Sequence, residues 1–137
     1  IRTHPNLRLI LVGEGPFRRF LMKFAYKSGL SDKVIFTGFV HHDRLVFYYR
    51  IAFAFVYPSY HESLPTAILE AMACGLPVIA TKAPGLFDLL DHGKVSILVP
   101  MKSPKKLAHA SLSTTFTATV GLGFIYGLLK PWHQSSQ

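Results

Sequence analysis

The chain has 137 residues, of which half are hydrophobic and only 16% are charged, and this composition excludes an intrinsically disordered protein. Lys and Arg outnumber Asp and Glu by 15 to 7, so the formal net charge is +8 and anionic partners are favoured. The basic residues form no dense run and no nucleic-acid-binding motif accompanies them, which favours phosphate ligands or an acidic membrane surface over nucleic acid. The single cysteine, Cys74, excludes an intramolecular disulfide and is compatible with the cytoplasm or the cytoplasmic face of a membrane.

The first predicted elements are a strand, a tight turn and a helix. Residues 7–13 are an apolar run that ends in a glycine, and residues 17–27 have apolar side chains at helical spacing after Pro16. The aromatic residues of this helix have the spacing of core residues: Phe17, Phe20 and Phe24. The turn lacks the third glycine of a dinucleotide-binding motif, because Arg18 stands in its place, so NAD binding is not predicted.

Strands and helices alternate along the next part of the chain. The predicted strands are residues 34–40, 52–57, 77–81 and 96–99, and the predicted helices are residues 43–49, 65–74 and 85–91. Gly75 follows the second of these helices, at the position of a C-terminal cap. Because the strands are apolar throughout, with Phe53 and Phe55 as core residues, we predict an α/β fold of Rossmann-like type: a parallel sheet with helices on both faces.

The character of the sequence changes beyond Ser103, and we divide the chain into a first domain, residues 1–110, and a divergent apolar tail of uncertain structure, residues 111–137. Residues 109–129 carry no Lys, Arg, Asp or Glu, and about 20 uncharged residues are long enough to span a bilayer. Their many hydroxyl groups and glycines make a poor apolar span, however. We therefore predict a packed or disordered tail and keep a transmembrane segment as the alternative.

Two carboxylates separated by seven residues, Glu62 and Glu70, are the strongest candidates for chemistry. Pro65 suits the first turn of the helix that carries Glu70, and the amide groups at such a helix end can hold phosphate oxygens. A carboxylate can accept hydrogen bonds from two neighbouring hydroxyl groups, so the pair could hold a ribose and a sugar. The alternative is that Glu62 caps the helix and Glu70 is an exposed surface carboxylate.

Residues 57–81, with the sequence YPSYHESLPTAILEAMACGLPVIAT, closely resemble the signature segment of family-4 glycosyltransferases of the GT-B fold. The resemblance covers residues 5–110 and implies that they are a partial donor-binding domain, the C-terminal half of such an enzyme. It implies that Glu62 is the catalytic carboxylate facing the transferred sugar and that Glu70 binds the nucleotide ribose. It also assigns further donor-binding residues: the backbone of Ser63, Leu64 and Pro65 for sugar and phosphates, Phe39 and Val40 for the nucleobase, and Gly13 and Gly15 in the loop beside the cleft.

The resemblance implies a retaining, hexosyltransferase-like reaction in which a nucleoside-diphosphate sugar is the donor substrate and no cofactor or bound metal is needed. His41, His42 and Asp43 could be read as a metal cluster, but three successive side chains converge poorly on one ion. Polar residues that open a helix explain them better. Cys74 lies on the predicted apolar helix and is expected to be core packing.

Several features of the resembled family are absent from this sequence. The N-terminal acceptor domain and the first strand of the donor domain, with an arginine and a lysine for the diphosphate, have no counterpart here. Phe53 and Ser96 stand where the family often has aspartate and glycine. We therefore expect the isolated chain to be an inactive fragment, since a cleft with one wall cannot orient both reactants. A binding-only module and a nonfunctional remnant are the alternatives.

Overall fold

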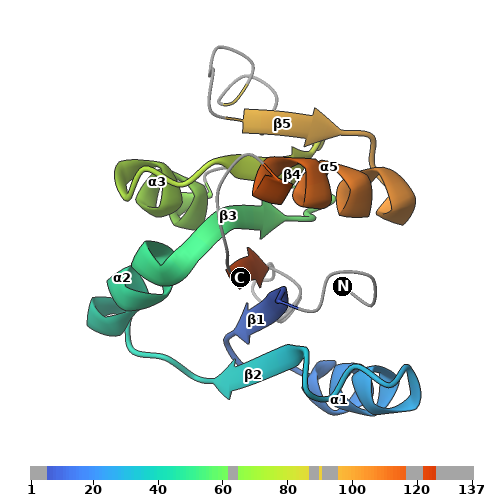
Figure 1. Ribbon diagram of the computed structural model, residues 1–137. Helices are drawn as coiled ribbons and strands as arrows, with labels where there is room; N and C mark the ends of the chain where they lie inside the picture. Colours follow the sequence, from blue (N-terminus) through green and yellow to red (C-terminus); the bar gives the residue numbers. More distant parts are fainter. Residues whose placement is uncertain (1–5, 62–64, 87–89, 91–95, 117–121, 126–137) are drawn as a thin grey trace, which may run out of the picture.

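The computed structural model describes residues 6–61, 65–86, 90, 96–116 and 122–125, which form one sheet covered by helices (Figure 1). Its strands are β1 (Arg8–Val12), β2 (Val34–Gly38), β3 (Ala52–Tyr57), β4 (Val78–Thr81), β5 (Ser96–Val99) and β6 (Leu122–Ile125). Its helices are α1 (Arg18–Lys27), α2 (His42–Ile51), α3 (Thr66–Ala73) and α5 (Pro104–Phe116). The strands and helices predicted from residue 7 to residue 81 are confirmed, with small shifts of their ends.

The sheet has the order β2-β1-β6-β3-β4-β5, and all of its paired strands are parallel. The chain steps outward from β1 to β2 on one side of the centre and from β3 to β5 on the other. The strand order therefore reverses between β1 and β3, where β6 lies. Sheets of this kind bind their ligands beside such a reversal, outside the carboxyl ends of the strands. The predicted Rossmann-like α/β fold is confirmed.

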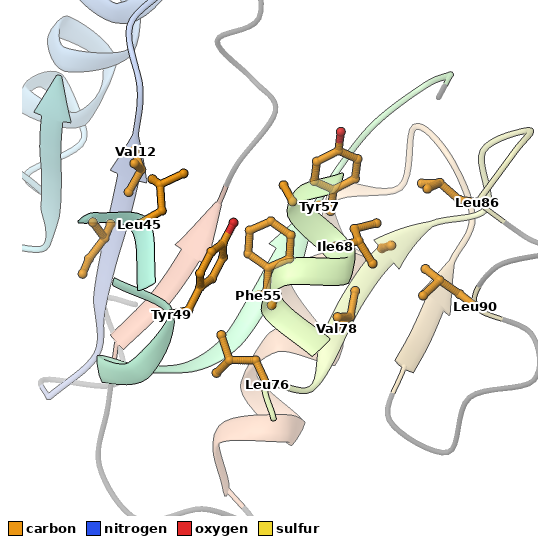
Figure 2. Packing of buried hydrophobic residues seen from close by; sticks show 14 of the residues in the cluster. Val12, Leu45, Tyr49, Phe55, Tyr57, Ile68, Leu76, Val78, Leu86 and Leu90 are labelled. Atoms are coloured by element: carbon orange, nitrogen blue, oxygen red, sulfur yellow. The ribbon is translucent and has the colours of Figure 1, made fainter. Parts of the chain in front are cut away.

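Alternating side chains of β3 and β4 point into two separate hydrophobic clusters, one on each face of the sheet. Phe55 and Val78 pack with residues of α2 and α3, including Tyr49 and Ile68, in the larger cluster (Figure 2). The smaller cluster lies beneath α5 and consists of Ala54, Val56, Ile79, Val99 and Ala110. Both faces of these strands are buried, which explains why their sequences are apolar throughout rather than alternating.

Helix α3 ends at a glycine cap. Gly75 has a φ of +76°, which glycine adopts without the steric cost of a side chain. Its N–H donates to the carbonyl of Met72 at 2.9 Å, and the N–H of Leu76 donates to the carbonyl of Ala71 at 3.0 Å. These two bonds make a Schellman motif, which satisfies carbonyl groups at the helix end and turns the chain toward β4. The predicted cap at Gly75 is confirmed.

The described residues of the tail lie in helix α5 and strand β6. Helix α5 runs across residue 110, and Ala110 is buried in the cluster beneath it. Strand β6 pairs with both β1 and β3 in the centre of the sheet. Over the described ranges, no helix is long and apolar enough to cross a membrane. The turns predicted at residues 85–91 lie mostly outside the described part of the chain, although Leu86 and Leu90 are buried.

One expectation about the core is wrong. The side chains of Phe17, Phe20 and Phe24 are exposed, and the only buried residue of α1 is Ala25. The helix turns Ala25 and the half-buried Leu21 toward the protein. Phe20 and Phe24 each precede one of these residues, so they are rotated by about 100° away from the buried face. Spacing alone therefore found a stripe of the helix but not the side that is buried.

Candidate functional site

Three of the predicted site residues follow the carboxyl ends of neighbouring strands or begin the helix after one. Gly13 follows β1, Phe39 follows β2, and Pro65 and α3 come after β3. Because the strands are parallel, these carboxyl ends share one edge. This is the edge at which open α/β sheets bind ligands.

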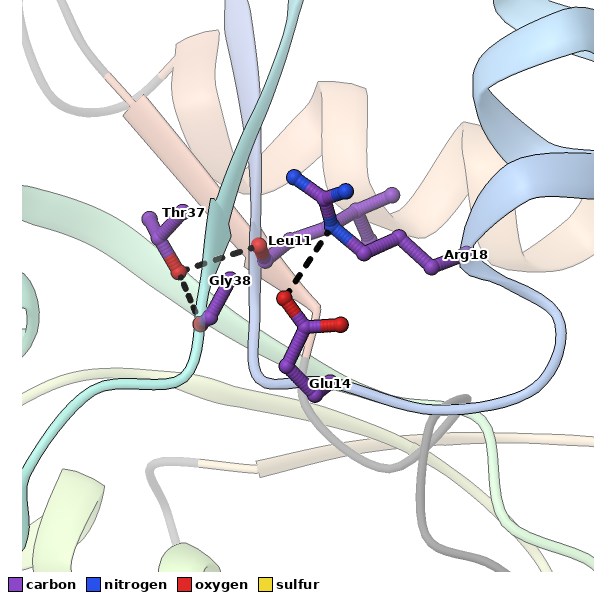
Figure 3. Close-up of polar contacts among 5 residues, drawn as sticks. All are labelled: Leu11, Glu14, Arg18, Thr37 and Gly38. Carbon is purple, nitrogen blue, oxygen red and sulfur yellow. Dashed lines mark hydrogen bonds and ion pairs between the residues drawn. The ribbon is translucent and has the colours of Figure 1, made fainter.

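The loop after β1 is fastened to the end of β2. The N–H of Gly13 donates to the carbonyl of Gly38 at 3.0 Å, and both glycines have a positive φ, +118° and +72°. A Cβ at Gly38 would lie 2.8 Å from Oε1 of Glu14, so a larger residue would displace that carboxylate. Glu14 in turn lies 3.4 Å from Nε of Arg18 (Figure 3). Gly13 thus has a structural role, and donor contacts by Gly13 and Gly15 stay a prediction.

Phe39 and Val40 lie together in an open hollow of about 580 Å³ beside the end of β2. The hollow is lined by Thr37, Phe39, Val40, His41, Asp43, Arg44 and Tyr48. The ring of Phe39 is 74% exposed and meets the ring of His41 edge to face, with centroids 6.0 Å apart. The lining therefore offers a free aromatic face next to polar and cationic side chains.

Glu70 is held by side chains of α2. The hydroxyl group of Tyr49 donates to Oε2 of Glu70 at 2.9 Å, and Nδ1 of His42 lies 3.9 Å from Oε1. The Glu70 side chain is 29% exposed, whereas Tyr49 is only 2% exposed. Glu70 is therefore a partly buried, oriented carboxylate rather than a freely solvated one.

Helix α2 connects the hollow to Glu70. His41 lines the hollow and the next residue, His42, approaches Glu70; Tyr48 lines the hollow and the next residue, Tyr49, binds Glu70. The two features thus lie on neighbouring sides of one helix. Tyr49 and His42 were not predicted as partners of Glu70, because no local pattern shows that Tyr49 meets a carboxylate 21 residues later in the chain.

The catalytic candidate, Glu62, lies outside the described residues, as do Ser63 and Leu64. Their predicted roles stay predictions. Pro65 is the N-cap of α3 and is buried, and its carbonyl accepts the N–H of Ile68 at 2.9 Å. Its ring has no oxygen that could accept a bond from the first amide groups of the helix.

The segment that leads to residue 62 is anchored on both sides. The hydroxyl group of Ser59 donates to the carbonyl of His61 at 3.1 Å. The hydroxyl group of Thr81, a buried polar side chain at the end of β4, donates to the carbonyl of Ser59. The carboxyl ends of β3 and β4 are thereby tied together next to the start of α3.

His41, His42 and Asp43 do not converge on one point. Nδ1 of His41 lies 3.3 Å from Oδ1 of Asp43, while His42 approaches Glu70 instead. In the part of the chain that the structure describes, no three His, Cys, Asp or Glu side chains gather as metal ligands would. Cys74 is half-buried and packs against the larger hydrophobic cluster, as expected.

Comparisons with known proteins agree on one family. The family model described as glycosyl transferases group 1 matches residues 1–114. An uncharacterized glycosyltransferase of Methanocaldococcus jannaschii is 37% identical over 103 residues, which are 75% of this chain and 26% of that protein. The 2-deoxystreptamine N-acetyl-D-glucosaminyltransferase of Streptomyces fradiae is 36% identical over 107 residues, which are 78% of this chain and 25% of that protein.

A third relative and one solved structure extend this likeness. The GDP-mannose-dependent alpha-(1-6)-phosphatidylinositol monomannoside mannosyltransferase of Mycobacterium tuberculosis is 35% identical over 109 residues, which are 74% of this chain and 28% of that protein. The chain therefore spans about a quarter of the length of these relatives. The apo form of the lipopolysaccharide outer core galactosyltransferase WaaB matches with a TM-score of 0.67 and 18% identity, over 86% of this chain and 42% of that one. That likeness concerns the fold alone.

Proposed function

Because the chain belongs to the family of glycosyl transferases group 1, we propose that it is the donor-binding part of a retaining, family-4 glycosyltransferase. In this proposal a nucleoside-diphosphate sugar binds at the carboxyl edge of the sheet, and its sugar is transferred to an acceptor by the whole protein. The observation that supports it best is the partly buried carboxylate of Glu70 on α3, oriented by the Tyr49 hydroxyl group of α2.

Glu70 is the proposed ribose ligand. A carboxylate has about four lone-pair sites, and the bond from Tyr49 uses one of them on Oε2. The remaining sites can accept the two neighbouring hydroxyl groups of a ribose. Because Tyr49 is buried in the core, its hydroxyl group holds the carboxylate in one orientation before the ligand arrives, which lowers the entropy cost of binding.

The hollow beside β2 is the proposed base site. Phe39 offers an exposed ring face, and a flat base can stack on such a face. Val40 completes the apolar part of the lining next to it. On α2, each residue that lines the hollow, His41 or Tyr48, is followed directly by a residue that contacts Glu70. A nucleoside could therefore place its base in the hollow and its ribose at Glu70.

The start of α3 is the proposed phosphate site. The amide groups of the first helical turn and the positive end of the helix dipole favour anionic oxygens, and Pro65 leaves these amides without a side-chain cap. Ser63 and Leu64 would contribute backbone groups there. Glu62 would face the transferred sugar and stabilise the positive charge that develops on it, while the donor phosphate assists deprotonation of the acceptor on the same face.

The donor is tested by isothermal titration calorimetry with UDP-glucose and GDP-mannose. Both are needed, because the names of the relatives include transferases of different sugars. We expect Glu70→Gln to weaken binding about tenfold to a hundredfold, the range for a lost hydrogen bond to a charged group. The matched control is Asp32→Asn, which also replaces a carboxylate by an amide. Asp32 lies in the turn before β2, at the end of the sheet where the strands begin.

Tyr49→Phe separates orientation from direct contact. It removes one hydroxyl group that touches Glu70 and leaves the carboxylate in place, so we expect a weakening of about two- to tenfold. If both variants bound both sugars as tightly as the unaltered chain, Glu70 would not be a donor ligand. A folded chain with no affinity for either nucleotide sugar would overturn the proposed donor site as a whole.

A further inference from the structure

The outward face of α1 carries large apolar side chains that no other part of the described structure covers. Phe20 is 64% exposed and Phe24 is 60% exposed, and Phe17, just before the helix, is exposed as well. The rings of Phe20 and Phe24 lie one turn apart, with centroids 6.4 Å apart and planes inclined by 21°. Such side chains together form a continuous aromatic row on a helix whose only buried residue is Ala25.

A basic row runs beside the aromatic row. Arg19, Lys23 and Lys27 follow one another at intervals of four residues, so they lie along one side of the helix and are exposed. The helix contains no acidic residue that could neutralise them. Rotations of 100° per residue place Lys23 and Lys27 next to Phe20, on the side away from the buried Ala25.

We infer that α1 binds the surface of an anionic phospholipid bilayer. The aromatic row enters the boundary between head groups and acyl chains, and the basic row meets the lipid phosphates. Helices that lie in a membrane interface combine an aromatic or aliphatic face with flanking Lys and Arg in this way. The net charge of the whole chain, +8, adds attraction to an anionic surface, adds none to a neutral one and opposes binding to a cationic one.

The position of α1 relates the aromatic row to the proposed donor site. The helix begins directly after the loop that follows β1, and Phe17 is therefore the part of the aromatic row that is closest to the ligand edge. A bilayer that holds α1 would thus lie beside the carboxyl ends of the strands. None of these α1 residues belongs to the proposed donor site, so membrane binding and donor binding can be tested separately, and one can fail without the other.

The test is cosedimentation of the chain with lipid vesicles. We expect binding to vesicles of phosphatidylcholine mixed with phosphatidylglycerol, weak binding to pure phosphatidylcholine, and a decrease with added salt. Lys23→Glu with Lys27→Glu, and separately Phe20→Ser with Phe24→Ser, should each weaken binding to the mixed vesicles about tenfold or more. The control is Lys105→Glu with Lys106→Glu, which makes the same charge change on the exposed start of α5.

Four outcomes would overturn the inference. The first is no binding of the unaltered chain to mixed vesicles, and the second is binding by both α1 double variants as tight as that of the unaltered chain. The third is a loss in the α5 control equal to that in the α1 variants, and the fourth is capture of oligonucleotides but not of vesicles. An association of the chain with itself that is lost with Phe20→Ser and Phe24→Ser, without vesicle binding, would assign the aromatic row to a second copy instead. Circular dichroism of each variant shows that it is folded, and calorimetry with a nucleotide sugar shows whether the donor site is independent.

Discussion

The two halves of the sheet are packed very differently, although both follow the same strand–helix pattern. On the side of β3 and β4, Phe55, Ile68 and Val78 are completely buried, and α3 buries three of its eight residues. On the side of β1 and β2, α1 buries one of its ten residues. The same local pattern therefore buries more of its helix in one half than in the other, although strand β1 itself is buried at Ile10, Leu11 and Val12.

Phe55→Ala should produce the largest loss of stability, because it removes a ring from the centre of the better-packed half. The ring meets Tyr49 edge to face at 5.7 Å and lies 5.8 Å from the ring of Tyr57. We expect a loss of about 3–5 kcal/mol in the free energy of unfolding, measured by denaturant titration. Phe47→Ala, at an exposed aromatic residue of α2, should change it by less than about 0.5 kcal/mol. Equal losses of stability for Phe55→Ala and Phe47→Ala would show that the half with β3 and β4 is not the better-packed one.

Strand β6 is the element that joins the two halves, and Phe124→Pro tests it. Phe124 lies opposite Ile10 of β1 and Phe55 of β3. Proline has no N–H to donate in the centre of a sheet, and the carbonyl partner is left buried without a donor. We expect a loss of about 2–3 kcal/mol in the free energy of unfolding. Phe124→Ala keeps the N–H, so a proline variant no less stable than the alanine variant would show that β6 does not join the halves.

The strands and helices between residues 7 and 81 could be predicted because their local sequence decides them. The apolar run that ends in a glycine predicted β1. Gly75 predicted the end of α3, since glycine adopts the positive φ of a helix cap without steric cost. The neighbours of β1 and β3 could not be predicted, because a parallel pairing depends on contacts far apart in sequence. The place of β6 between them is such a contact.

The candidate site was partly predictable for a similar reason. The family resemblance proposed Glu70 and Phe39 as site residues, since both lie within short segments that match the family. The bond from Tyr49 to Glu70 joins two helices across the core, and no spacing in either helix specifies the partner. The exposure of Phe20 was missed because a helical stripe shows which residues share a face, not which face meets the sheet.

Phe20→Ser should have the smallest effect on stability, which sharpens the contrast between the halves. The ring is 64% exposed and its aromatic contact is Phe24, one turn away on the same helix, so little buried area is lost. We expect the free energy of unfolding to change by less than about 0.5 kcal/mol in the same denaturant titration. A loss above about 1 kcal/mol would mean that the aromatic row packs against protein in solution. In that case α1 would belong to a core, and the aromatic row would no longer be free to meet a bilayer.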